Sequence, residues 1–182
     1  MNPLYILIAI IVIILIFVIW YISTSNKLNR SIVKIDEALS GIDVALTKRY
    51  DVLTKMIEVV KSYTDYEKDT LFETIKLRKD MTIKERSDAN KAMDESFKNI
   101  SVVAENYPEL KSSDNYKTLQ HSIVDVEEHL QAARRLYNSN ASIYNQLLVS
   151  FPTSIIAKNK GMIKKDFFEA DDMKKEDVKI NL

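Results

Sequence analysis

The feature that most constrains this chain is an unbroken run of nineteen apolar residues from Leu4 to Ile22. In a helix, which rises ~1.5 Å per residue, such a run is roughly 28 Å long, close to the hydrocarbon thickness of a bilayer. A core helix would carry a polar face, and this run carries none. Tyr5 lies near one end, and Trp20 and Tyr21 lie at the other, where aromatic side chains meet lipid headgroups. The run therefore predicts a transmembrane helix.

Charge at the two flanks predicts the orientation of this helix in the cell membrane. No Lys or Arg precedes it, whereas Lys27, Arg30 and Lys34 follow it closely. Because basic flanks stay in the cytoplasm, we expect a single-pass protein with its short N-terminus outside, its helical domain inside, and Lys27 and Arg30 at the interface. A cleaved signal peptide is the alternative, but the basic n-region is missing and the apolar run is too long. The chain has no Cys, which excludes an acylated N-terminal cysteine.

The rest of the chain has the composition of long helices. Gly occurs twice and Pro three times, so the sequence has few helix breakers. Lys and Arg number 26, and Asp and Glu also number 26, so no net charge draws the chain to nucleic acid or to anionic lipid. We expect an all-α protein in three parts: a transmembrane anchor over 1–25, a helical bundle over 26–170 and a charged tail over 171–182.

Two long stretches place their apolar residues at alternating steps of three and four. One runs from Asn26 to Tyr63, and the other runs from Asp114 to Phe151. Such a repeat winds one apolar seam along a helix. Two shorter helices are predicted between them, from Glu67 to Lys79 and from about Lys84 to Asn106. Two long helices of matching length are most simply explained as partners along one bundle. They can run antiparallel, in an up-and-down bundle of four helices, or parallel, with the shorter helices as one broken return column.

Two polar residues, Arg49 and Asn140, stand at seam positions where an apolar residue is expected. One interpretation is that each helix rotates slightly and both side chains reach solvent. The other is that they fix the register by pairing with buried polar partners, as single polar residues do in coiled coils. In the antiparallel arrangement Arg49 lies level with Leu130, one turn from Glu127, which is then its expected partner. In the parallel arrangement Arg49 would lie near Asn140.

The sequence offers little for catalysis or metal binding. His121 and His129 are two helical turns apart, roughly 12 Å, so one metal ion cannot bind both. Two glycines cannot build a Gly-rich phosphate loop, and nothing marks a strained nucleophile turn. We therefore predict a protein that is not an enzyme, without catalytic, cofactor-binding or metal residues, and without a cofactor or a small-molecule substrate.

Several different short motifs follow one another along most of the chain. They are Arg49-Tyr50-Asp51, Val60-Lys61-Ser62-Tyr63 with Glu67, Thr70-Leu71-Phe72-Glu73, the run from Ala104 to Lys111, Leu119-Gln120, Glu127 with Ala133-Arg134, Tyr137-Asn138, Tyr144-Asn145, Phe151-Pro152, Phe167-Phe168-Glu169 and Val178-Lys179-Ile180. With these spacings, the sequence resembles the LemA family of bacterial membrane-anchored helical proteins. It departs from the family pattern at Thr54-Lys55, where Pro-Asn is usual, and at Ser62 and Tyr66, where Gly and His are common.

The resemblance implies an antiparallel four-helix bundle behind one N-terminal membrane helix. Family members are often encoded near membrane proteases or other envelope proteins, which implies a protein partner without identifying it, and some relatives are lipoproteins. We expect a membrane-anchored interaction or scaffold protein of the bacterial envelope, whose bundle surface and Tyr/Phe-rich distal end bind another protein. A signal-transducing or envelope-stress component, coupled to a membrane partner such as a protease, is the alternative. An undetected hydrolase is the third hypothesis.

Overall fold

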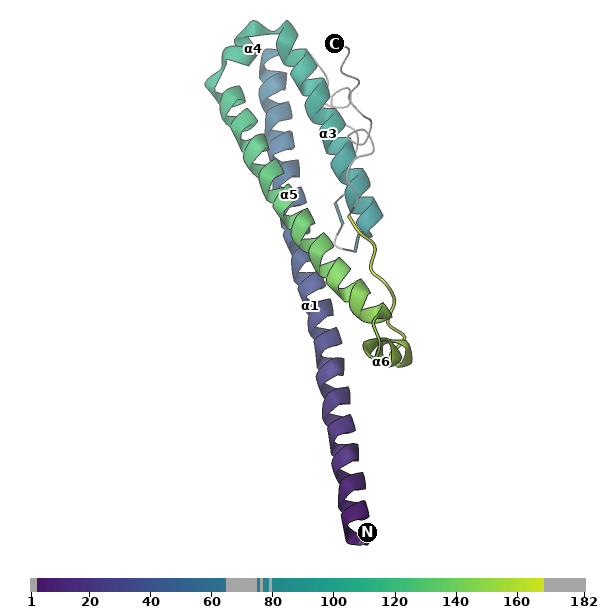
Figure 1. The fold of residues 1–182 in the computed structure, drawn as a ribbon. Helices are drawn as coiled ribbons and strands as arrows, with labels where there is room; N and C mark the ends of the chain where they lie inside the picture. The colour runs from purple at the N-terminus through teal and green to yellow at the C-terminus, as the bar shows by residue number, and fades with distance from the viewer. Residues whose placement is uncertain (1–2, 65–74, 76, 79, 169–182) are drawn as a thin grey trace, which may run out of the picture. The chain divides into compact units, whose positions relative to one another are not determined.

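The computed structural model describes residues 3–64, 75, 77–78 and 80–168 (Figure 1). Within these residues all regular secondary structure is helical, which confirms the predicted all-α class. The predicted helix from Glu67 to Lys79 falls outside the described residues except for Ile75, Leu77 and Arg78, which are not helical. The predicted tail over 171–182 lies wholly outside them.

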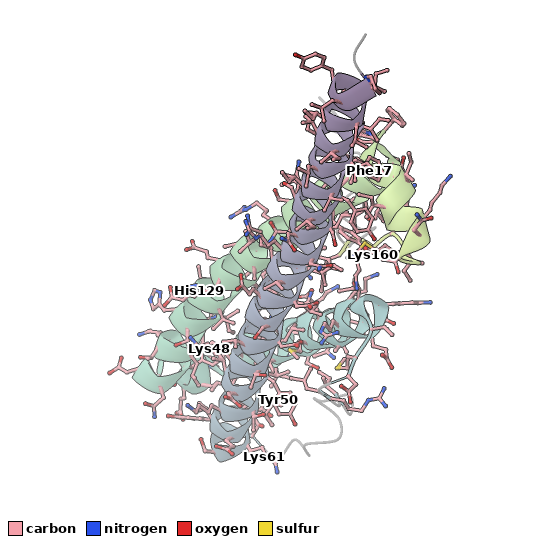
Figure 2. All side chains as sticks on the ribbon, turned by 90° about the horizontal axis from the view of Figure 1, so that it is seen from below. Phe17, Lys48, Tyr50, Lys61, His129 and Lys160 are labelled. Atoms are coloured by element: carbon pink, nitrogen blue, oxygen red, sulfur yellow. The ribbon has the colours of Figure 1, made fainter. Side chains whose placement is uncertain are left out.

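Helix α1 (Pro3–Tyr63) is a single helix of 61 residues. No proline interrupts it after its first residue, so its backbone hydrogen bonds continue from the apolar run into the polar part of the chain. Around Phe17 its side chains project on every side and are exposed (Figure 2). Among the described residues, α1 contains the one stretch that is long and apolar enough to cross a membrane.

Gly41 is the one glycine inside α1 and provides a test of helix packing. A Cβ added there would lie 3.9 Å from the Ala133 Cβ, an ordinary van der Waals contact. Gly41→Ala should raise the free energy of unfolding by about 0.5–1 kcal/mol, because Ala favours helix and restricts the unfolded chain. Urea denaturation followed by circular dichroism measures the difference. A lower midpoint for the variant would contradict this packing.

Four further helices follow within the described residues. They are α3 (Ile83–Asn106), α4 (Pro108–Ser112), α5 (Asp114–Val149) and α6 (Thr153–Asn159). The start of α3 is set by a capping box, in which Thr82 Oγ1 accepts from the Glu85 N–H and Glu85 Oε2 accepts from the Thr82 N–H. The hydrogen bond from the Thr82 backbone N–H to the Glu85 carboxylate lowers the pKa of Glu85.

The chain divides into two compact units, which we describe separately. The anchor unit comprises Met1–Ala38 and Asn138–Asp166, and the core unit comprises Leu39–Tyr137 and Phe167–Leu182. Helices α1 and α5 each contribute one part to both units.

In the core unit, α3 runs in the same direction as the adjoining part of α1. Asp43 of α1 contacts Arg86 of α3, and Arg49, further along α1, contacts Asp94, further along α3. Residue number therefore increases together in the two helices. In the sequence, residues 64–82 separate these two parallel helices.

Helix α5 runs in the opposite direction through the core unit. Gly41 lies beside Ala133, and Arg49 lies beside Glu127, so residue number rises along α1 as it falls along α5. Figure 1 shows α4 at the end of this unit, where the chain passes from α3 to α5. Pro108 begins α4 directly after α3, as expected for a residue that cannot continue a helix.

The apolar core of this unit is built from all of its helices. Leu53, Met93, Ile100 and Leu110 have no exposed surface, and Tyr116 is 1% exposed. Burying one such side chain contributes about 1.5–3 kcal/mol before the entropy cost of ordering it. Burial also raises the pKa of Tyr116.

In the anchor unit the buried side of α5 differs from the predicted seam. Phe151 is 82% exposed, and Leu147 is only half-buried, whereas Ala141 and Leu148, one position further along, are buried. An α-helix has 3.6 residues per turn, so a seven-residue seam drifts by about 20° per heptad along a straight helix. Over the length of α5 this drift moves the buried side by one residue. Phe151, the last residue of the predicted repeat, lies beyond the end of α5 at Val149 and does not continue its buried side.

Candidate functional site

The buried polar residue of α1, Arg49, contacts polar side chains from two other helices of the core unit. Its side chain is 4% exposed. Its guanidinium donates from Nη1 to Asn90 Oδ1 and from Nη2 to Asp94 Oδ1, both on α3. The same Nη2 lies 3.1 Å from Oε2 of Glu127 on α5. Arg49 therefore joins three helices through one planar group.

Further contacts hold the partners of Arg49 in position. Asn90 Nδ2 donates to the second carboxylate oxygen of Asp94 over 3.2 Å, and Gln131 Nε2 donates to Glu127 Oε1 over 3.0 Å. The Phe97 ring centroid lies 5.4 Å from Arg49 Cζ, within range of a cation–π interaction. The Arg49 Nε has no hydrogen-bond partner among the described residues. The site is thus anchored by the outer nitrogens of the guanidinium.

A second buried arginine, Arg86 of α3, forms a bidentate ion pair with Asp43 of α1. Its Nε lies 2.6 Å from Asp43 Oδ1, and its Nη2 lies 2.8 Å from Oδ2. The Arg86 side chain is 4% exposed. The hydrogen bond to Asp43 raises the pKa of Arg86 above its ordinary value. This geometry matches the planar fork of Arg to the two oxygens of a carboxylate, the strong form of such a pair.

Sequence reasoning identified Arg49 and Glu127 but missed the polar residues of α3. Arg86, Asn90 and Asp94 recur every four residues, so they form one stripe along that helix. This four-residue spacing is the sequence pattern that could have identified them, because residues four apart lie on the same face of a helix. The capping box of Thr82 and Glu85, which a Thr-x-x-Glu spacing indicates, was also missed.

The side chains of this network are better suited to holding the helices in position than to catalysis. Two arginines face three carboxylates, those of Asp43, Asp94 and Glu127. A guanidinium does not release its proton at physiological pH, so neither arginine can act as a general acid or base. Among the described residues, no group of three or more His, Asp or Glu side chains is arranged to bind a metal ion. His121 and His129 are both exposed on α5.

Asn140, the other polar residue of the predicted seams, lies in the anchor unit and is half-buried. Its Nδ2 donates over 2.9 Å to the backbone carbonyl of Lys34 on α1. Its observed partner is thus a main-chain oxygen of the neighbouring helix, whereas the register hypothesis called for a buried polar partner. The bond fixes this turn of α5 against α1.

The five predicted interface residues all lie on α1. Tyr5 and Tyr21 are exposed, Trp20 is half-buried, and the Trp20 ring lies 5.5 Å from that of Phe17, measured between centroids. The other two residues are the exposed cations Lys27 and Arg30.

Several hollows lie on the surface of the described residues, and each unit has at least one. One, of about 510 Å³, lies in the core unit and is lined by Met56, Phe97, Lys98, Ser101, Lys117, Gln120, His121, Ile123 and Val124. Another, of about 390 Å³, lies in the anchor unit and is lined by Ser23, Asn26, Lys27, Arg30, Ser31, Lys34, Asn140, Ile143 and Leu147.

Comparison with known proteins places this fold in a family. Protein LemA of Metamycoplasma hominis is 27% identical over 171 residues, which cover 90% of this chain and 77% of that protein. Magnetosome protein MamQ of Magnetospirillum gryphiswaldense is 29% identical over 69 residues, which cover 38% of this chain but only 25% of MamQ. The model of the LemA family matches residues 38–182, most of the chain. This protein belongs to the LemA family.

Proposed function

We propose that this protein is a membrane-anchored interaction protein of the cell envelope that performs no catalysis. In this proposal residues 1–25 anchor the chain, 26–170 form an antiparallel four-helix bundle and 171–182 form a charged tail. The opposite directions of α1 and α5 in the core unit support the bundle arrangement. The basic flank after Ile22 supports a cytoplasmic bundle with the N-terminus outside.

The observation that carries this proposal is the hollow of about 510 Å³ in the core unit. Its apolar lining comes from the half-buried Phe97 of α3 and Ile123 of α5, above the buried Met56 of α1, so all three long helices contribute to it. Val124 is 57% exposed at this hollow. Apolar surface that stays exposed in a concave site is a common mark of a binding surface.

Charge at the hollow indicates the chemistry of the partner. Lys98, Lys117 and His121 line it and are exposed, and its other polar lining consists of the uncharged Ser101 and Gln120. A matching surface would bring a carboxylate beside an apolar side chain. We therefore propose that the hollow binds an acidic, partly apolar segment of another protein.

The hollow supports this role better than the aromatic distal end that the sequence suggested. Tyr116, one of the aromatic residues of that end, is buried in the core and is unavailable to a partner. Tyr107 is half-buried, and Tyr63 is 40% exposed.

Site-specific photo-crosslinking in cells tests the partner surface. A photoreactive amino acid at Val124 should give one discrete crosslinked species after solubilisation of the membranes. Val44, also in the core unit, is the matched control, because it is 54% exposed and does not line the hollow. His121→Glu in the Val124 probe protein should reduce the crosslink, because it places a negative charge against an acidic segment.

The outcome at the two positions decides the proposal. A crosslink at Val124 that Val44 does not give supports a specific partner surface there. Equal crosslinking at Val44 and Val124, or none at Val124, would contradict it. Stronger crosslinking after His121→Glu would show that the partner segment is basic and would overturn the proposed chemistry.

A further inference from the structure

The neutral overall charge of the chain hides an uneven distribution between the units. The anchor unit has seven basic and three acidic residues, an excess of four positive charges. Because the whole chain balances at 26 and 26, the core unit has an excess of four negative charges. The basic residues of the anchor unit are Lys27, Arg30, Lys34, Lys158, Lys160, Lys164 and Lys165, and the acidic ones are Asp36, Glu37 and Asp166. The part of the chain that contains the apolar run is therefore basic.

Three of these cations form a stripe on α1. Lys27, Arg30 and Lys34 follow one another at steps of three and four, so they lie on one face of the helix. All three are exposed. Among the described residues, no carboxylate forms an ion pair with any of them. Glu37, three residues beyond Lys34, continues the same face at the end away from the apolar run and forms no ion pair with the stripe among the described residues. Three like charges on one face attract an anion, most strongly at the Lys27 end, away from this carboxylate.

This stripe lines the hollow of the anchor unit. Helix α5 supplies the opposite side through Asn140, Ile143 and Leu147, so the hollow combines cations with apolar side chains. The bond from Asn140 Nδ2 to the Lys34 carbonyl holds α5 in place beside the stripe. On the same unit, Lys160 Nζ donates to Ser25 Oγ, which brings a further cation to α1 between the stripe and the apolar run (Figure 2).

The membrane-proximal part of the stripe also lies near the depth of lipid headgroups if the apolar run spans a bilayer, whereas Lys34 lies roughly 18 Å beyond Ile22 along the helix axis, outside that layer. Lys27 is five residues beyond Ile22, roughly 7.5 Å along the helix axis, and Arg30 is roughly 12 Å beyond it. The headgroup layer extends about 5–7.5 Å from the hydrocarbon on each side. Side chains of a helix lean toward its N-terminus, here toward the membrane, and long basic side chains extend to the interface.

We propose that this hollow binds the phosphate group of an anionic membrane lipid. Lys27 and Arg30 contact the phosphate, Lys34 adds positive charge at the far end of the hollow, and Ile143 and Leu147 cover its apolar side. The inference rests on the proposed membrane anchor but concerns a different surface from the partner hollow. It holds for either orientation of the helix, because it requires only an anionic leaflet on the side of Lys27.

Fluorescence of Trp20 in the full-length protein tests this proposal, because Trp20 is the only Trp in the chain and lies next to the stripe. The protein is placed in phosphatidylcholine vesicles in which the same minor fraction of lipid is dibrominated phosphatidylglycerol or dibrominated phosphatidylcholine. Bromine quenches Trp fluorescence on contact. Quenching should show a roughly fivefold or greater enrichment of the anionic lipid, the factor that corresponds to one juxtamembrane cation.

Two triple variants, each of which removes three positive charges, show which cations cause the enrichment of the anionic lipid. Lys27→Gln, Arg30→Gln and Lys34→Gln together should abolish the enrichment. The control combines Lys48→Gln, Lys55→Gln and Lys61→Gln, three exposed lysines of α1 in the core unit, and should retain it. Both triple variants should match the wild type in helix content by circular dichroism. Equal loss in the control, or no enrichment in the wild type, overturns the proposal.

Substitutions at two uncharged positions test whether the lipid binds in the hollow itself or is attracted only by the positive charge of the unit. Asn140→Ala keeps every cation but removes the bond to Lys34, and should reduce the enrichment. Leu147→Glu, a second variant, places a carboxylate in the hollow and should reduce it further. Full enrichment in both variants would overturn the site.

A final measurement distinguishes binding of a lipid headgroup from binding of free inorganic phosphate. Inorganic phosphate should displace brominated phosphatidylglycerol no better than KCl at the same ionic strength. Specific displacement by phosphate would show that the hollow binds the free anion, and would overturn the lipid assignment. Failure of the crosslink at Val124 leaves this result unaffected, so the two proposals are tested independently.

Discussion

Replacing Arg49 with Ala should lower the free energy of unfolding by about 3 kcal/mol. The variant loses the contacts that join α1 to Asp94 on α3 and to Glu127 on α5, and it leaves two carboxylates facing each other without a counter-charge. Both carboxylates are partly exposed, at 42% and 33%, so water limits the loss. Urea denaturation of the detergent-solubilised protein, followed by circular dichroism, measures the change.

Three comparisons separate charge from packing at Arg49. Arg49→Met keeps much of the side-chain volume and should show whether an apolar side chain recovers part of the loss. Lys48→Ala, at the exposed neighbouring position, should change stability by less than about 0.5 kcal/mol. A double-mutant cycle with Glu127→Gln should give a coupling energy of roughly 0.5–3 kcal/mol. Strict additivity in that cycle would argue against a stabilising contact between the two residues.

The second large effect is expected at Asp43, the partner of the buried Arg86. Asp43→Ala should cost about 3 kcal/mol, because the Arg86 guanidinium stays buried without its carboxylate. The same denaturation experiment measures it. Asp51→Ala removes an exposed carboxylate from the same helix and serves as the control.

The pairing of Asp43 with Arg86 predicts a specific rescue. Arg86→Met removes the buried positive charge that Asp43→Ala leaves without a partner. The double variant should therefore be more stable than Asp43→Ala alone. If Asp43→Ala costs no more than Asp51→Ala, then water or another group satisfies Arg86, and the ion pair contributes little to stability.

The sequence by itself determined the features that depend on neighbouring residues. The apolar run from Leu4 to Ile22 and the continuity of α1 follow from local composition, because helix formation uses hydrogen bonds between residues four apart. The end of α3 at Asn106, just before Pro108, is local for the same reason. The run from Ser112 to Asp114 offers more than one residue able to cap α5, and in the structure Ser113 Oγ accepts from the Tyr116 N–H. The repeat along α1 and α5 also indicated which sides are buried, until the helical period moved the buried side of α5 near its end.

Only the tertiary structure decided which polar groups meet. Glu127 could be deduced as a neighbour of Arg49 by assuming that two long helices run in opposite directions. Asn90 and Asp94 could not, because their approach depends on where α3 lies after a connection whose path the sequence does not specify. The pairing of Asp43 with Arg86 across 43 residues depends on the same placement. A side chain can reach only the few residues that packing brings within hydrogen-bond distance, so the partners of the buried arginines are a property of the packed helices.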